Sequence, residues 1–124
     1  MINIEKELKD LIENEAIAFS TSDEKGNPHV IAVGFVKVVS KDEILVTDNY
    51  MNETLKNLQK NKNVALAVWC SNWKKECVGY ELKGIATYLN SGKWIEFVKK
   101  IPENKGMPAK GAIIIKITKI KKVT

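Results

Sequence analysis

One polar turn near the middle of the chain gathers most of the side chains that could bind a ligand. It follows the apolar run at residues 44–46 and precedes Leu55 and Leu58, whose spacing is typical of a helix. The side chains are those of Thr47, Asp48, Asn49, Asn52 and Thr54. Because a helix N-terminus presents free backbone N–H groups and a partial positive charge, this turn suits an anion, and a small-molecule phosphate best. The competing interpretation is an ordinary helix for which Asn52 is the N-cap.

The other reactive side chains show no catalytic or metal-binding motif. Cys70 and Cys77 have six residues between them, which is not the C-x-x-C spacing of redox or zinc motifs. Since His29 is the single histidine, one subunit cannot assemble a four-ligand Cys/His metal site. We therefore expect no metal and two reduced cysteines, with a disulfide as the alternative. We interpret His29 as a surface residue at the start of a strand.

Length and composition indicate one ordinary globular domain. The chain has 124 residues, of which 44% are hydrophobic and 28% charged, so it can bury a core without disulfides or metals. No apolar run approaches the length of a membrane span, and the first residues do not resemble a signal peptide. We therefore expect a single domain over residues 1–124 and a cytoplasmic protein.

All the basic residues are lysines, and the formal net charge is +5. Arginine, the usual bidentate partner of phosphates, is absent. Lysines cluster towards the C-terminus, at Lys99 and Lys100 and again at Lys119, Lys121 and Lys122. Because few aromatic residues lie among them and no nucleic-acid-binding motif is present, a solvated lysine surface is favoured over a nucleic-acid site.

Hydrophobic periodicity predicts short strands joined by tight turns, with a few helices. The predicted strands cover residues 16–22, 29–39, 43–47, 63–70, 78–89 and 111–120. The predicted helices cover residues 3–14, with Asn3 as N-cap, 52–60 and 91–100. Residues 71–76 are predicted as a polar loop, and Gly84 indicates a bulge in the fifth strand. Six antiparallel strands without regular helical crossovers favour a mainly β, closed or half-closed barrel over a parallel sheet.

Four stretches of the chain carry a family resemblance. Residues 18–30 are similar to a hairpin with the pattern T-x-D-x-x-G-x-P-H, and residues 44–47 to the strand that follows it. Residues 54–64 are similar to K/T-x-x-N-L-x-x-N-P-x-V, and residues 79–86 to G-x-x-x-x-G-x-A. In this order and spacing, over about residues 4–120, the chain resembles the FMN-binding split-barrel family of pyridoxamine 5′-phosphate oxidase-like proteins.

The resemblance implies a six-stranded antiparallel split β-barrel and a homodimer with one FMN in each of two clefts at its interface. It also implies a set of cofactor-binding residues. Val33, Gly34 and Phe35 match the strand along the isoalloxazine ring, and Lys37 lies near a basic flavin contact. Thr47 and Asp48 match the pyrimidine or ribityl side of the flavin, and Asn52, Glu53 and Thr54 match the phosphate-binding turn.

Two departures from the family pattern bear on function. Glu53 stands where many relatives have a basic residue, so its charge opposes a phosphate, while Thr54 keeps a hydroxyl donor. A lysine such as Lys56, or one from a second subunit, could supply the missing charge. Residues 116–124 lack the arginine and histidine that pyridoxamine phosphate oxidases use on their substrate, so we do not expect pyridoxal phosphate synthesis.

We hypothesise an FMN-binding flavoprotein that acts as a flavin-dependent oxidoreductase or an electron-transfer protein, with the redox chemistry carried by the flavin. No catalytic residue is identified, and the substrate and electron donor stay open. The alternatives are the same fold with a deazaflavin or a haem, a non-catalytic flavin-binding protein, or a cofactor-free dimeric binding module. Trp73 is a candidate for stacking on the flavin, with simple packing as its alternative. Met107 belongs to either a lid or a simple surface loop.

Overall fold

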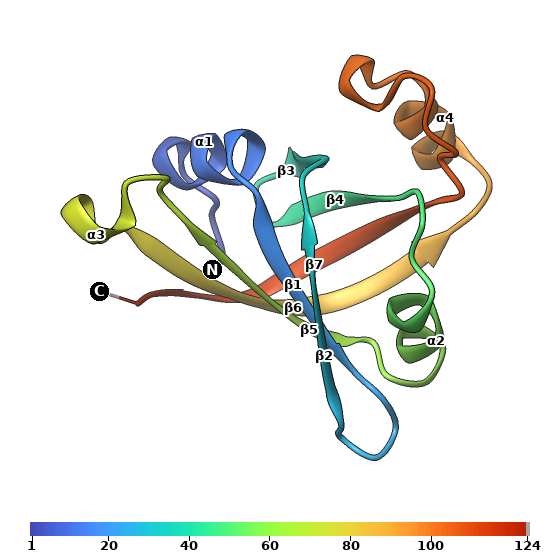
Figure 1. The fold of residues 1–124 in the computed structure, drawn as a ribbon, viewed down its shortest axis with the longest axis horizontal. Coiled ribbons are helices and arrows are strands. Elements are labelled where there is room, and N and C mark those ends of the chain that lie inside the picture. The colour runs from blue at the N-terminus through green and yellow to red at the C-terminus, as the bar shows by residue number, and fades with distance from the viewer. Residues whose placement is uncertain (124) are drawn as a thin grey trace.

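Seven antiparallel strands form one strongly curved sheet, with helices packed around it (Figure 1). The structure is a computed structural model and describes residues 1–123. The strands are β1 (Ile17–Ser22), β2 (Pro28–Val33), β3 (Val36–Ser40), β4 (Glu43–Asp48), β5 (Asn63–Trp69), β6 (Gly79–Leu89) and β7 (Gly111–Lys122). The helices are α1 (Lys6–Asn14), α2 (Glu53–Lys60), α3 (Trp73–Glu76), α4 (Lys93–Lys99) and the short 3-10 helix η1 (Pro102–Asn104). Within residues 1–123, no helix has the length and apolar character needed to cross a membrane.

The closure of this sheet follows from its strand order, β2-β1-β5-β6-β7-β4-β3. The two edge strands, β2 and β3, are neighbours in the sequence and are joined only by Gly34 and Phe35. Because this connection spans at most roughly 11 Å, the sheet has to curl until its two edges meet. At this seam, the Thr47 N–H donates a hydrogen bond to the Phe35 carbonyl (3.3 Å). The predicted mainly β, antiparallel, half-closed barrel is confirmed.

The number of strands differs from the prediction, because the segment predicted as one strand over residues 29–39 forms two. Its break at Gly34 and Phe35 carries the chain from one edge of the sheet to the other, so the sheet has seven strands instead of six. The predicted bulge at Gly84 is confirmed, since the pairing of β6 with β7 shifts register between Lys83 and Gly84. A Cβ at Gly84 would lie 2.5 Å from the Lys116 carbonyl oxygen, which explains the glycine.

Two helical predictions need correction. The first helix begins at Lys6 with Glu5 in the N-cap position, and Asn3 does not cap it. The reason is that the Ile4 N–H donates to the Lys41 carbonyl (2.7 Å) beside the β3–β4 turn, which holds the preceding residues in an extended path. The predicted loop at residues 71–76 contains the short helix α3.

The barrel interior holds the main hydrophobic core. Alternate residues of β5 point inward, and Phe19, Leu66 and Leu82 from three neighbouring strands are buried there. β4 is buried on both faces, because Leu45 packs with Val98 of α4 in a second cluster on the outer side of the strand. This double burial explains why residues 44–46 are continuously apolar instead of alternating.

Hydrogen bonds to β1 hold α2 so that its N-terminus lies at the seam. The Asn57 Nδ2 donates to Thr21 Oγ1 (3.0 Å), and both side chains are buried. The Asn61 Nδ2 donates to Ser22 Oγ (2.9 Å), and Leu58 packs into the main core. The position of α2 is therefore fixed by the strand that also pairs with β2.

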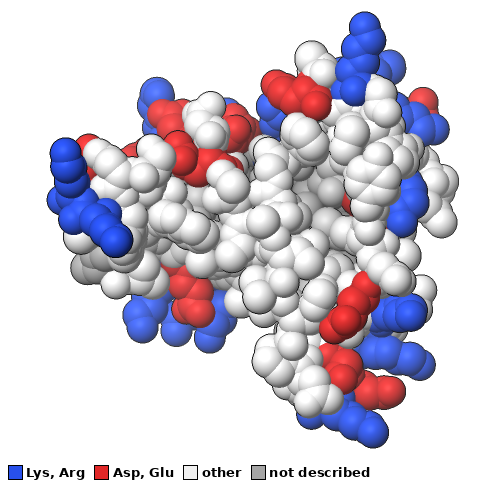
Figure 2. Space-filling view, in the orientation of Figure 1, with Lys and Arg blue, Asp and Glu red and all other residues white. Residues whose placement is uncertain are grey.

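Charged side chains are unevenly distributed over the surface. Figure 2 shows Lys, Asp and Glu gathered towards the outer parts of the molecule in this view. The middle of the same face, where Figure 1 places β1 and β2, is largely uncharged. The strands next to the seam thus present a mostly neutral surface on this side.

Candidate functional site

A cavity of about 570 Å³ lies at the seam, and we call it the seam cavity. Its walls come from β2, the corner between β2 and β3, the end of β4, the turn before α2, the start of α2, and the loop before β7. The lining residues are His29, Ile31, Ala32, Val33, Gly34, Phe35, Thr47, Asn49, Tyr50, Met51, Asn52, Glu53, Thr54 and Met107. They include seven of the nine predicted cofactor-binding residues, namely Val33, Gly34, Phe35, Thr47, Asn52, Glu53 and Thr54.

Asp48, an eighth predicted site residue, is fully buried and does not line the seam cavity. Its Oδ1 accepts a hydrogen bond from the Met51 N–H (2.9 Å), and its Oδ2 accepts one from the Tyr88 hydroxyl (2.5 Å). Burial, followed by the bond to this carboxylate, raises the pKa of Tyr88, so the phenol stays protonated. Asp48 therefore shapes the turn before α2 from behind the cavity wall.

Lys37, the ninth predicted site residue, lines a small adjoining cavity together with Gly34 and Phe35. Its Nζ lies 3.7 Å from Glu103 Oε1. The ammonium group is thus a neighbour of the seam cavity and not part of its lining, and a carboxylate partly balances its charge.

Two of the residues that line the seam cavity have buried hydroxyls without a hydrogen-bond partner among the described protein atoms. They belong to Thr47, near the end of β4, and to Thr54, the second residue of α2. Thr47 is 6% exposed and Thr54 is 1% exposed. Leaving a buried hydroxyl unpaired costs about 1–3 kcal/mol, so these are groups that polar atoms of a ligand could satisfy.

The N-terminus of α2 opens onto the same cavity without a side-chain cap. Asn52 occupies the N-cap position, as the capped-helix interpretation predicts, but its side chain makes no capping hydrogen bond. Backbone N–H groups of the first turn therefore keep the capacity to donate to a ligand. This geometry favours the anion-site interpretation of the turn.

Among residues 1–123, those that line the seam cavity include one acidic side chain and no lysine. The acidic residue is Glu53, whose Oε2 lies 3.2 Å from His29 Nδ1. Lys110 reaches the turn at the Met51 carbonyl, which accepts a hydrogen bond from its Nζ (3.1 Å). A phosphate at the start of α2 would therefore meet neutral donors and a carboxylate within the lining.

His29 is the most informative residue that the sequence interpretation missed. The interpretation makes it a surface residue, but the structure places it in the cavity wall beside Glu53, with its side chain 24% exposed. Alternate residues of a strand share a face, so the prediction of Val33 as a site residue implies that Ile31 and His29 face the same site. The sequence pattern could therefore have indicated His29.

The loop before β7 is held against the turn by the buried side chain of Asn49. The Asn49 Nδ2 donates to Asn104 Oδ1 (2.7 Å), and its Oδ1 accepts a hydrogen bond from the Ala109 N–H (2.9 Å). These bonds place Met107 in the cavity lining, where the loop forms part of the wall. Only tertiary structure could bring Met107 to this place, since no local pattern links it to the turn.

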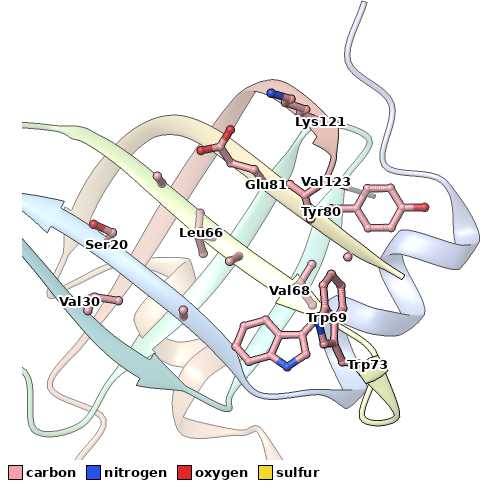
Figure 3. A pocket seen from close by; sticks show the side chains of 14 residues that line it. Ser20, Val30, Leu66, Val68, Trp69, Trp73, Tyr80, Glu81, Lys121 and Val123 are labelled. Carbon is pink, nitrogen blue, oxygen red and sulfur yellow. The ribbon is translucent and has the colours of Figure 1, made fainter. Parts of the chain in front are cut away.

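A second, mainly apolar cavity of about 660 Å³ lies on the outer face of β1, β5 and β6, and we call it the outer cavity (Figure 3). Small residues such as Ala18, Ala65 and Ala67 line it, and Trp69 and Trp73 lie beside each other at one end. Trp73, the predicted candidate for stacking on a flavin, therefore lines the outer cavity and not the seam cavity.

β2 separates the two cavities. Val30 lines the outer cavity and is 62% exposed, whereas the preceding residue, His29, lines the seam cavity. Trp69, also on the outer cavity, is 41% exposed. A large apolar surface is thus exposed one strand away from the candidate site.

The amino-acid sequence has a clear family match. The family model described as pyridoxamine 5′-phosphate oxidase matches residues 4–124. An uncharacterized protein from Methanocaldococcus jannaschii is 32% identical in an alignment of 124 positions that covers 97% of this chain and 80% of that protein.

Solved structures show the same fold at lower identity. HupZ from Group A Streptococcus has a TM-score of 0.87 at 24% identity, over 97% of this chain and 94% of that chain. An FMN-binding protein from Syntrophomonas wolfei has a TM-score of 0.80 at 20% identity, over 94% and 83% of the two chains.

Two more distant structures have names that refer to other cofactors. An F420 reductase has a TM-score of 0.69 at 16% identity, over 91% of this chain and 94% of that chain. The haem storage protein HutZ from Vibrio cholerae has a TM-score of 0.71 at 14% identity, over 98% and 95%. These likenesses confirm the split-barrel fold, and the match of the family model over nearly the whole sequence shows that the chain belongs to the pyridoxamine 5′-phosphate oxidase family.

Proposed function

We propose that the chain is a homodimeric FMN-binding flavoprotein that holds its cofactor in the seam cavity. The observation that carries the proposal is the convergence of two unpartnered buried hydroxyls, Thr47 and Thr54, with the uncapped start of α2. The cavity volume, about 570 Å³, lies within the roughly 300–1,000 Å³ of typical cofactor pockets. Membership of the family and the FMN-binding structural neighbour support the choice of a flavin.

Each predicted site residue has a role in this proposal. Val33, Gly34 and Phe35 would lie along the isoalloxazine ring, through their backbone and apolar surface. Thr47 would donate its hydroxyl to the pyrimidine or ribityl side, and Asn52, Glu53 and Thr54 would lie at the phosphate end. Asp48 would hold the turn in place through Met51, and Lys37 would add positive charge from the adjoining cavity.

A bound flavin would supply electron or hydride transfer, which protein side chains do not carry out by themselves. The groups of this chain would bind and orient the ring and limit the access of water to it. A flavin-dependent oxidoreductase or an electron-transfer protein is the class of function that such a site supports.

The exposed surface around the outer cavity supports the proposed homodimer. A second copy seated over Val30 and Trp69 would remove both side chains from water, which stabilises association by roughly 25 cal/mol per Å² of apolar surface. Because β2 also forms a wall of the seam cavity, the second copy would stand beside the cofactor site. The family resemblance implies the same arrangement, with each cofactor at the interface.

Titration of the cofactor-free protein with FMN, followed by flavin fluorescence, tests the proposal. We expect saturable binding of one FMN per subunit. Thr54→Ala should weaken binding about tenfold, because one hydrogen bond contributes about 1–1.5 kcal/mol. Thr118→Ala, which changes an exposed threonine on β7, is the matched control and should bind FMN as the wild type does. No binding at high-micromolar FMN would contradict the proposal.

The alternatives are a non-catalytic or cofactor-free binding protein, which one observation favours, and the same fold with a deazaflavin or a haem. Glu53 places a carboxylate at the end of the cavity where an FMN phosphate would lie. The visible absorption spectrum of the purified protein separates these cofactors, since each absorbs differently. Steady-state turnover of a reduced nicotinamide with an electron acceptor would distinguish an enzyme from a non-catalytic binding protein.

A further inference from the structure

We infer that Glu53 makes the seam cavity insensitive to the 5′-phosphate of a flavin, so that riboflavin, which lacks the phosphate, binds about as tightly as FMN. The inference rests on the proposed function, because it concerns the same site and the same class of ligand. It goes further in naming the part of the ligand that the site recognises and the residue that sets this preference.

Positive charge is sparse around the seam cavity. No lysine is present among the described residues that line the seam cavity, and the chain has no arginine. Lys37 lies near Glu103 in the adjoining cavity, and Lys110 donates to the Met51 carbonyl. A phosphate at α2 would therefore lack, from the lining of its own subunit, the charge-assisted hydrogen bond that raises affinity by roughly tenfold to hundredfold in ordinary phosphate sites.

The Glu53 carboxylate stands at the start of α2, where an anion would bind. Glu53 is the first residue of α2, so its own negative charge stands at the helix end that would attract an anion. The contact between Glu53 Oε2 and His29 Nδ1 (3.2 Å) joins α2 to β2 in the wall of the cavity that both residues line, and the Glu53 side chain is 65% exposed, so water screens its charge in part. A phosphate at the backbone N–H groups of α2 would lie close to this carboxylate, and their repulsion would offset the attraction of the helix.

The remaining side-chain donors are two uncharged hydroxyls. The hydroxyls of Thr47 and Thr54 are neutral, buried and without a protein partner among residues 1–123. Thr47 suits the carbonyls of the pyrimidine ring and the hydroxyls of the ribityl chain, and Thr54, at the phosphate end, suits the terminal oxygen of that chain, which is a neutral acceptor in both ligands. FMN and riboflavin have these parts in common, so both ligands would gain the same contacts.

Parallel titrations of FMN and riboflavin against the wild type, Glu53→Gln and Glu53→Lys test the inference at one fixed ionic strength. We expect the two wild-type Kd values to agree within about threefold. Glu53→Lys should tighten FMN binding at least about tenfold and leave riboflavin binding unchanged, with Glu53→Gln in between. Glu7→Lys, which makes the same change of charge in the first turn of α1, is the matched control and should alter neither affinity.

The outcomes separate this inference from the proposed function. A wild type that binds FMN at least about tenfold more tightly than riboflavin would overturn the inference and leave the proposed function standing. Equal affinities that do not respond to either Glu53 variant would also overturn it, because Glu53 would then not set the preference. Failure of both flavins to bind folded wild-type protein would overturn the proposed function itself. Glu53→Gln keeps the size of the side chain, so the test stands even if Glu53→Lys does not fold.

Discussion

Three buried threonines near the seam differ in whether their hydroxyl groups have a partner. Thr21 Oγ1 accepts a hydrogen bond from the Asn57 amide, whereas Thr47 and Thr54 have none within the described part of the chain. A buried hydroxyl without a partner lowers stability, and a methyl group in its place would not. The two unpartnered threonines line the seam cavity, where the proposed ligand would supply the missing partners.

Thr47→Val should therefore have opposite effects on stability and on binding. We expect the free energy of unfolding of the cofactor-free protein to rise by about 1 kcal/mol, because an unpaired hydroxyl is removed, and FMN affinity to fall by about five- to tenfold. Urea denaturation measures the first effect and fluorescence titration the second.

Thr21→Val is the matched control, since this threonine is equally buried but hydrogen-bonded. It should lower the free energy of unfolding by about 1–3 kcal/mol, because the Asn57 amide loses its acceptor. If Thr47→Val were also destabilising, the Thr47 hydroxyl would have a partner in the folded protein and our interpretation of it would be wrong.

At the level of secondary-structure elements, two partly buried hydrogen bonds to the Asp48 carboxylate connect three segments around the site. Tyr88 on β6 donates to Asp48 at the end of β4, and Asp48 in turn accepts the Met51 N–H of the turn before α2. Gly111 at the start of β7 makes room for the Tyr88 ring, since a Cβ there would overlap it. The shape of the seam cavity thus depends on residues that do not line it.

Tyr88→Phe should lower the free energy of unfolding by about 1–3 kcal/mol at neutral pH, because a buried carboxylate oxygen loses its donor. The pKa of Tyr88 is raised above its ordinary value of 10.0 in the folded protein. Its contribution to stability is therefore fully present below pH 10.0 and is lost as the pH rises through the higher folded value. The difference between wild type and variant should stay constant up to about pH 10 and shrink above it.

Chemical denaturation across the alkaline range measures this difference. Tyr80→Phe is the control, because Tyr80 lies on the same strand and its hydroxyl makes no hydrogen bond to a residue in the range 1–123. It should show neither the loss at neutral pH nor the change above pH 10. A Tyr88→Phe difference that is independent of pH would show that the phenol hydroxyl is not the source of the effect.

Local sequence patterns predicted most of the candidate residues that line the seam cavity, and long-range contacts explain where the fold and the lining differ from the prediction. The turn at residues 47–54 combines hydroxyls, amides and a helix start, so it could be proposed as a ligand site without a structure. The break between β2 and β3 could not be predicted from the sequence, because Gly34 and Phe35 form no turn motif. The break arises because the two edges of the sheet have to meet. The sequence predicts Asp48 as a cofactor-binding residue. Its hydrogen bond with Tyr88 could not be predicted, because Tyr88 lies 40 residues further along the chain.

At the scale of the whole molecule, the curl of the sheet places two cavities on opposite sides of one edge strand. The seam cavity contains the polar groups, and the outer cavity contains exposed apolar side chains. Among the described strands β2 pairs with β1 alone, and Val30 on its outer side is 62% exposed. Covering the outer cavity should therefore also steady the wall of the seam cavity.

Trp69→Glu tests this coupling between assembly and cofactor binding. A carboxylate in the apolar surface of the outer cavity should convert a wild-type dimer to a monomer and weaken FMN binding in the same variant. Analytical ultracentrifugation measures the first effect and fluorescence titration the second. Phe97→Glu is a close control, because Phe97 on α4 and Trp69 are both 41% exposed but Phe97 lines neither cavity. A monomeric wild type would contradict the proposed dimer. A monomeric Trp69→Glu variant with unchanged affinity for FMN would show that one subunit forms the complete flavin site, because β2 would then hold its position without a second subunit.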